Sequence, residues 1–234
     1  MAMQFEQTPT PAVFVRRDNR FRVTVEVDGR EVQAHLPNSG RLTELLIPGR
    51  QVWLGPACAA ARRTGYDLLL VEHDGLLVSV DARLPNRLLR EALMAGGLPP
   101  FPEVSALRSE VPRGASRLDF LLDATDGPPI WIEAKSVTLV EDDVALFPDA
   151  PTARGRRHLI ELQDAVAAGD RAAVVFVVQR DDASAFAPHP MADPAFRTEL
   201  REASRRGVSV HAVACRVGVC SIEVSHPLPV LLPD

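Results

Sequence analysis

The chain has 234 residues, of which 46% are hydrophobic and 24% are charged, an ordinary composition for one large globular domain or two small ones. No apolar run approaches the roughly 20 residues of a membrane-spanning helix, which argues against a helical membrane protein. The formal net charge of −5 argues against a strong, general nucleic-acid binder, because such domains are usually basic overall.

The first part of the chain predicts a series of short strands, over residues 12–17, 20–27, 31–36, 51–54, 67–72 and 76–80. Asp18-Asn19 and Asp28-Gly29 are the expected hairpin turns, and a short helical turn over 43–47 is expected to end at Pro48-Gly49. Many short antiparallel strands in so few residues favour a closed barrel. We therefore expect an OB-like β-barrel domain over residues 1–82.

Residues 83–234 predict a second domain, in which strands and helices alternate. Helices are expected over 84–95, over 152–168 with Thr152 as the N-cap, and over 194–206. Strands are expected over 109–111, 117–122, 130–134, 172–179, 208–213 and 217–224. The apolar run 172–179 indicates a strand buried on both faces. The predicted fold class is α/β (mixed), with a central mixed sheet and helices outside it.

The cysteines and the N-terminal residues predict the cellular compartment. Cys58, Cys215 and Cys220 show no Cys-x-x-Cys spacing, so we expect free thiols in a reducing compartment. The first residues lack a basic segment followed by an apolar one, so no secretory signal is expected. We predict a cytoplasmic protein with no membrane partner, and leave its oligomeric state open.

Lys135 is the only lysine, among 25 arginines. Arginine stays protonated, whereas lysine carries a compact charge whose pKa can shift, so a lone lysine suggests a position that needs an amine. Lys135 ends the segment Ile-Trp-Ile-Glu-Ala-Lys, and Asp119 lies in the apolar segment before it. An Asp in one strand and Glu-x-Lys in the next resemble the metal-dependent PD-(D/E)XK nuclease site.

The expected hairpin brings the two carboxylates together. A turn centred near residue 126 places Asp119 opposite Glu133, with Cβ atoms about 5 Å apart. Two carboxylates in apolar surroundings must share a proton, pair with a cation or bind a metal. Oxygen ligands without His or Cys fit Mg²⁺ or Mn²⁺. Lys135 shares a strand face with Glu133, and would orient an attacking water or stabilise developing charge. The alternative is an ion triad in which Lys135 only neutralises a carboxylate.

Other charged residues are weaker candidates. Glu91 and Glu110 are possible additional carboxylates, although Glu91 could equally be an exposed helix residue paired with Arg87. His158 shares a helix face with Arg154 and either contacts phosphate or forms a polar edge of the core. Basic residues contact nucleic acid only if they converge in space; the candidates are Arg16, Arg17, Arg113, Arg117, Arg154, Arg157 and His158.

Longer strings resemble one known family. The strings are His35 to Thr43, Asn86-Arg87-Leu88 with Glu91-Ala92, Ser116 to Phe120, Ile132 to Leu139, and Leu146 to Leu159. They are similar to the sugar fermentation stimulation protein A family, and the match covers nearly the whole chain. The resemblance implies an OB-like domain joined to a PD-(D/E)XK nuclease-like domain. It also implies a bacterial or archaeal cytoplasmic protein that binds DNA without marked sequence preference and is linked to sugar, especially maltose, metabolism.

Carried over by motif, the resemblance implies that Asp119, Glu133 and Lys135 are the catalytic residues and that Asp119 and Glu133 hold Mg or Mn. Three functions stay open. The first is a DNA-binding protein with a working Mg²⁺-dependent phosphodiesterase site. The second is a catalytically silent DNA-binding regulator on a nuclease fold. The third is an oligosaccharide or effector binder through the OB-like domain.

Overall fold

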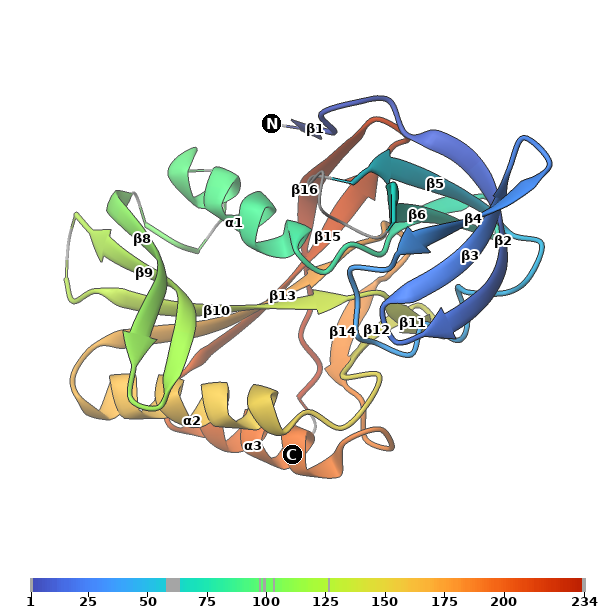
Figure 1. Ribbon diagram of the computed structural model, residues 1–234. Coiled ribbons are helices and arrows are strands. Elements are labelled where there is room, and N and C mark those ends of the chain that lie inside the picture. Colours follow the sequence, from blue (N-terminus) through green and yellow to red (C-terminus); the bar gives the residue numbers. More distant parts are fainter. Residues whose placement is uncertain are drawn as a thin grey trace.

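The computed structural model describes residues 2–57, 64–96, 98, 100–102, 104–125 and 127–232. Cys58 and the centre of the predicted hairpin at residue 126 lie outside these ranges. Cys215 and Cys220 are free thiols, as expected. Figure 1 shows a β-barrel beside a larger sheet that carries helix α1 on one face and helices α2 and α3 on the other.

The barrel is built from six strands in the order β4-β3-β2-β5-β6-β7, and a parallel pairing between β4 and β6 closes it. The strands are β2 (Thr10–Asn19), β3 (Arg22–Val27), β4 (Arg30–His35), β5 (Gln51–Pro56), β6 (Tyr66–His73) and β7 (Leu76–Ser79). Alternate apolar residues such as Val23 and Val25 point inward and are fully buried. The predicted OB-like barrel is confirmed.

The second sheet has seven strands in the order β1-β16-β15-β13-β10-β9-β8. They are β1 (Met3–Gln4), β8 (Val104–Arg113), β9 (Ser116–Ala124), β10 (Ile130–Val137), β13 (Arg171–Val178), β15 (Ser209–Val217) and β16 (Ser221–Leu228). The strand β13 runs parallel to β10 and β15, and its residues from Ala172 onward are all buried. The apolar run therefore forms a central strand covered on both faces, and the mixed α/β class is confirmed.

The helices cover this sheet because each has one apolar face. Helix α1 (Leu84–Met94) packs Leu88, Leu89 and Leu93 on one side of the sheet. Helix α2 (Ala153–Ala167) and helix α3 (Pro194–Arg205) cover the other side. Thr152 caps α2 as predicted, since its hydroxyl accepts a hydrogen bond from the Gly155 N–H at 3.0 Å.

Several predicted boundaries are wrong. The first hairpin turns at Arg20-Phe21 and not at Asp18-Asn19, because the Asn19 side chain accepts the Phe21 N–H at 2.9 Å. The edge strand β8 is much longer than 109–111, and β16 begins later than residue 217. A three-stranded sheet of β11 (Leu139–Glu141), β12 (Val144–Phe147) and β14 (Ala185–Pro188) was not predicted.

The barrel and the α/β part are joined by buried polar contacts. The Ser79 N–H donates to the Gln179 carbonyl, and the Ser79 hydroxyl donates to the Gln179 side-chain oxygen, both at 3.0 Å. The Gln179 amide donates in turn to the Ser136 hydroxyl at 2.9 Å. Ser79 and Gln179 are both fully buried. The domain boundary at residue 82, between β7 and α1, stays a prediction.

Gln179→Met is expected to destabilise the protein by about 1–3 kcal/mol, because the fully buried Ser79 hydroxyl loses its acceptor. Urea unfolding measures the change in the free energy of unfolding. Ser79→Ala in the same chain removes the unpaired hydroxyl and should recover part of the loss. If the double variant instead loses the sum of the stabilities lost in the two single variants, the two side chains are not in direct contact.

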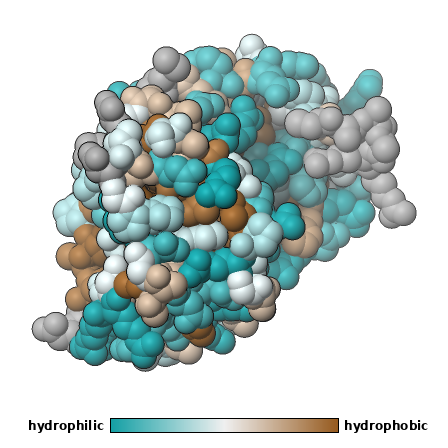
Figure 2. Space-filling model, turned by 90° about the vertical axis from the view of Figure 1, so that its left-hand side faces the viewer, coloured by the Kyte–Doolittle hydropathy of each residue, from teal (hydrophilic) through white to brown (hydrophobic). Residues whose placement is uncertain are grey.

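One face of the molecule is largely polar. Figure 2 shows a face on which hydrophilic residues dominate and hydrophobic ones appear in small groups. In the part of the chain that the structure describes, no helix is both long and apolar enough to cross a membrane.

Candidate functional site: a carboxylate cleft between barrel and sheet

The hairpin register places the two predicted carboxylates together. Ile132 pairs with Phe120, so the next residues along the two strands are Glu133 and Asp119, as predicted for a turn centred at residue 126. The Asp119 carboxylate accepts the Ala134 N–H at 2.8 Å, and so satisfies a backbone donor of the neighbouring strand. Its other oxygen accepts the Asn86 side-chain amide at 2.8 Å.

Glu133 is the most enclosed charged group of the site, with 3% of the residue exposed. One carboxylate oxygen, Oε1, accepts from both Lys135 Nζ and His158 Nδ1. The other oxygen, Oε2, is buried and has no hydrogen-bond partner within the described residues. A buried carboxylate oxygen without a partner is costly, and a bound cation would relieve that cost.

His158 orients Glu133 from helix α2. Its Nε2 accepts from Arg154 Nε at 3.3 Å. Because a guanidinium can only donate, the His158 proton must lie on Nδ1, facing Glu133. His158 is 3% exposed. It therefore supports the site as a polar group at the edge of the core, which is the second of the two alternatives expected from the sequence.

The two carboxyl groups have opposite pKa shifts. Burial, together with the charge of Glu133, raises the pKa of Asp119 to about 6. Burial would also raise the pKa of Glu133, but the Lys135 ammonium and the His158 hydrogen bond outweigh it and hold that pKa below its ordinary value. The two carboxyl groups lie close together, and Lys135 is the cation paired with Glu133.

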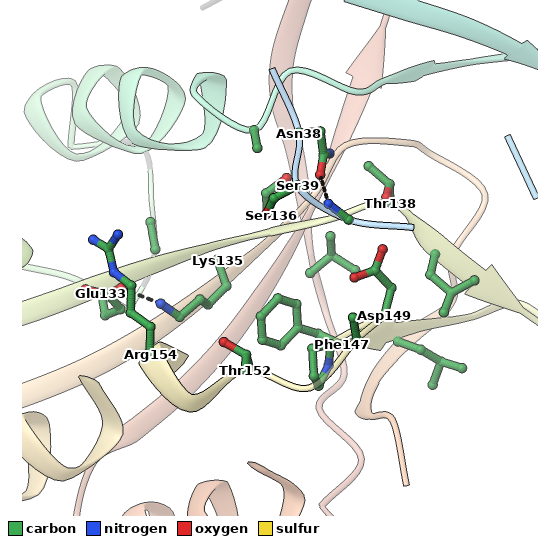
Figure 3. Close-up of a pocket in the computed structure, with 18 of the residues that line it drawn as sticks. Asn38, Ser39, Glu133, Lys135, Ser136, Thr138, Phe147, Asp149, Thr152 and Arg154 are labelled. Atoms are coloured by element: carbon green, nitrogen blue, oxygen red, sulfur yellow. Dashed lines mark hydrogen bonds and ion pairs between the residues drawn. The ribbon is translucent and has the colours of Figure 1, made fainter. Parts of the chain in front are cut away.

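These residues line a cleft of about 480 Å³ between the barrel and the sheet. Figure 3 shows Glu133, Lys135 and Arg154 at one end, the loop of Asn38 and Ser39 above, and Phe147 and Asp149 towards the other end. Glu110 also lines the cleft from β8. Its position in the β8–β9 register is opposite Asp119, between the pairs Ser109–Phe120 and Val111–Leu118.

The residues fit a divalent cation that keeps most of its own water. Among the described residues, no group of three or more His, Cys, Asp or Glu side chains forms a ready metal cage. Mg²⁺ does not require one, because it commonly binds through one or two carboxylates, several waters and substrate phosphate. Asp119 and the unpaired Glu133 Oε2 provide such a pair of oxygen ligands.

The other predicted site residues do not all converge. Glu91 is exposed on α1 and is not among the cleft-lining residues. Arg113 stacks over the Trp131 ring and pairs with Asp170, so it is held in a packing role away from the cleft. Arg117 is exposed, and Arg157 is exposed with its guanidinium on the Ser116 hydroxyl. Of the predicted phosphate contacts, Arg154 alone lines the cleft, and His158 reaches it through Glu133.

The two barrel arginines that were predicted to contact nucleic acid, Arg16 and Arg17, are not among the residues that line the cleft. Arg16 pairs with Asp18 and Glu31. Arg17 donates to the carbonyls of Asn19, Arg20 and Arg41. Arg17 thus connects the hairpin to the loop above the cleft, and Arg20 is the barrel arginine that lines it.

Three residues that line the cleft were not predicted as site residues from the sequence: Asn86, Arg20 and Asp149. The Asp149 carboxylate accepts the Arg41 N–H at 2.6 Å and joins the two walls of the cleft. The only available indication was that Asn86 and Asp149 fall within the strings that resemble the family. Neither residue shows a spacing that marks it independently, because their partners lie 33 and 108 residues away.

Asp119→Asn is expected to stabilise the metal-free protein by up to about 2 kcal/mol above pH 6. A carboxyl whose pKa rises on folding favours the folded state below its unfolded pKa of 3.8, and this contribution is lost as pH rises through 6. An asparagine at position 119 has no charge to bury, so the variant does not lose this stability as pH rises. The cost of rearranging the Asn86 hydrogen bond is subtracted from that gain. Urea unfolding from pH 4 to pH 8 should therefore show a gain that grows with pH. A gain that stays constant between pH 4 and pH 8 would contradict this explanation.

Family models match most of the chain. Residues 15–80 match the SfsA N-terminal OB domain, and residues 83–219 match the sugar fermentation stimulation protein RE domain. The chain belongs to the sugar fermentation stimulation protein family. This confirms the family resemblance seen in the sequence.

Individual members of the family match over nearly their full length. A sugar fermentation stimulation protein homolog of Moorella thermoacetica is 47% identical over 222 residues, which covers 94% of this chain and 96% of the relative. One from Desulforamulus reducens is 44% identical, over 94% of this chain and 92% of the relative. The structure of Pyrococcus furiosus SfsA in complex with Ca²⁺ superposes with a TM-score of 0.89, at 33% identity and 98% coverage of both chains.

Proposed function

We propose that this family member binds nucleic acid across the cleft and hydrolyses phosphodiester bonds there with a divalent cation held by Asp119 and Glu133. The observation that carries the proposal is the buried, unpaired Glu133 Oε2 close to a second carboxylate whose pKa is raised to about 6. Such a pair is unfavourable for folding alone and suits a site that takes up a cation. The Ca²⁺ complex of the Pyrococcus furiosus relative supports a divalent cation here as well.

Each residue has a role in this proposal. A bound Mg²⁺ or Mn²⁺ supplies the Lewis acidity that lowers the pKa of water and offsets charge on phosphate. Lys135 is hydrogen-bonded to Glu133 and lies in the cleft, where its ammonium can orient the attacking water or stabilise the charge that develops on the phosphate oxygens. Arg154 and Arg20 line the same cleft and would bind the flanking phosphates.

The partner that fits these groups is DNA, bound through its backbone without marked sequence preference. Arginine and lysine contacts to phosphate carry no sequence information, and their affinity falls steeply with salt. The acidic net charge of −5 argues against a broad basic binding face, so the contacts proposed here are those of the cleft. The link to sugar metabolism is carried over with the family resemblance.

Cleavage of a labelled panel of single-stranded, duplex and branched DNA tests the proposal. We expect product with Mg²⁺ or Mn²⁺ and none with EDTA. Binding without cleavage of any substrate under any of these conditions would reject the enzymatic function.

A catalytically silent DNA-binding regulator is the second candidate. The observation in its favour is that Lys135 already pairs with Glu133, as in the ion triad considered from the sequence. A salt-dependent complex that is insensitive to divalent cations would support this alternative.

A further inference from the structure

The two ends of the cleft differ in chemistry. The end at Glu133, Lys135 and Arg154 is charged. At the other end the lining includes the apolar side chains of Leu139, Leu146 and Phe147. Figure 3 shows the Phe147 ring between Lys135 and Asp149, below the loop that carries Ser39. The charged end suits a phosphate group. The apolar surface beside it does not, and so points to a different part of the ligand.

Phe147 is the only aromatic residue that lines the cleft in the described ranges, and it is rigidly supported. Its ring centroid lies 5.1 Å from that of Phe196 and 5.4 Å from that of Phe176. Those two rings are fully buried, while Phe147 stays half-buried and faces the cleft. A fixed aromatic ring next to cationic side chains is the arrangement by which proteins bind unpaired bases by stacking.

The polar groups around Phe147 suit the edge of a base. Asp149 Oδ2 accepts the Arg41 N–H, which holds the loop in place, and the Asp149 carboxylate belongs to the lining of the same end of the cleft. The Ser39 side chain belongs to the same wall. A base stacked on Phe147 would therefore have an acceptor and a hydroxyl within the lining of the pocket.

A contact between the two walls limits what can enter. Gly40 lies against Asp149 so closely that a Cβ at that position would collide with the carboxylate. Together with the Arg41 hydrogen bond, this contact bridges the cleft beyond Phe147. The volume of about 480 Å³ falls in the range of pockets for single small ligands. A pocket of this volume can hold a ligand of about the size of one nucleotide, and it is too small to enclose a duplex.

We propose that the Phe147 end of the cleft is a binding site for one unpaired nucleobase, so that the site takes single-stranded or displaced nucleic acid in preference to continuous duplex. This inference rests on the proposed function, because it places the base beside the phosphate held at the Asp119–Glu133 end. Enzymes that act on nucleotides inside a duplex must first unstack them, which a single strand makes unnecessary.

The test is the affinity of the full chain for a fluorescent 12-nucleotide oligo-dT and for the same strand annealed to oligo-dA, with Ca²⁺ present. We expect the single strand to bind at least about tenfold more tightly, in line with stacking energies measured per base. Phe147→Leu keeps the apolar contacts with Phe176 and Phe196 but removes the stacking surface, and should lower single-strand affinity by about tenfold. Phe101→Leu, at a half-buried ring on His211 outside the cleft, is the matched control.

Equal affinity for the single strand and the duplex, or an unchanged affinity in Phe147→Leu, would overturn the inference. These outcomes are distinct from failure of the proposed function. Single-strand preference lost in Phe147→Leu, in a protein that cleaves nothing, would keep the base site and reject catalysis. Rapid cleavage of continuous duplex that Phe147→Leu does not alter would keep catalysis and reject the base site.

Discussion

Glu133→Gln is expected to lower divalent-cation-dependent cleavage by at least about 10³-fold, the scale of losing one essential electrostatic group. The glutamine oxygen can still accept from Lys135 and His158, so the local fold should be kept. The uncharged amide group, however, cannot act as an anionic ligand in place of the unpaired Oε2. Initial rates on the preferred substrate of the DNA panel measure the loss.

Glu223→Gln is the control for this substitution. Glu223 lies on β16, pairs with Arg216 on β15 and does not line the cleft, so its replacement should leave the rate within about twofold. A Glu133→Gln protein that keeps more than a tenth of the wild-type rate would show that catalysis, if present, lies elsewhere.

Lys135→Met is expected to destabilise the protein by about 3 kcal/mol at pH 8, because it leaves the Glu133 carboxylate buried without its ammonium partner. The pH dependence has a defined sign. The pKa of Glu133 is depressed in the folded protein, so its contribution to stability is present above the ordinary value of 4.5 and lost as pH falls below it. The difference between wild type and Lys135→Met should therefore shrink towards pH 4. Urea unfolding at both pH values measures it.

Lys135→Arg separates the structural role of this residue from the catalytic one. It keeps the positive charge, and should recover more than half of the stability lost in Lys135→Met. Cleavage should stay low, because the guanidinium is planar, larger and differently placed from the compact ammonium. Full cleavage by Lys135→Arg would mean that only a charge is needed, and would remove the reason for a lone lysine among 25 arginines.

Local patterns predicted the site better than they predicted its surroundings. Asp119 and Glu133 each lie seven residues from the centre of the hairpin, so they are expected to lie opposite each other. The observed register agrees with this expectation. Phosphate contacts could not be selected in the same way. Arg113 and Arg154 look alike in the sequence, yet Trp131 and Asp170 hold the first while the second faces the cleft. Which arginine is free depends on packing partners that are distant along the chain.

Strand prediction failed where alternation of apolar residues is weak. The edge strand β8 has no buried residue in its described pattern, so its periodicity does not reveal its length. The short strands β11, β12 and β14 form a separate small sheet through one parallel and one antiparallel pairing between residues up to about 40 positions apart. Pairing of this kind is set by the tertiary fold.

By itself the sequence determined the two-part architecture, the central buried strand, the N-cap at Thr152, the position of Asp119 opposite Glu133 and that of Lys135 beside Glu133. These features depend on periodicity, turn residues and short-range register, which act between near neighbours. Only the tertiary structure decided that His158 supports Glu133, that Asn86 holds Asp119 and that the loop of Gly40 bridges the cleft to Asp149. These contacts join residues from 25 to 108 positions apart, and they exist because the packed cores bring separate elements together.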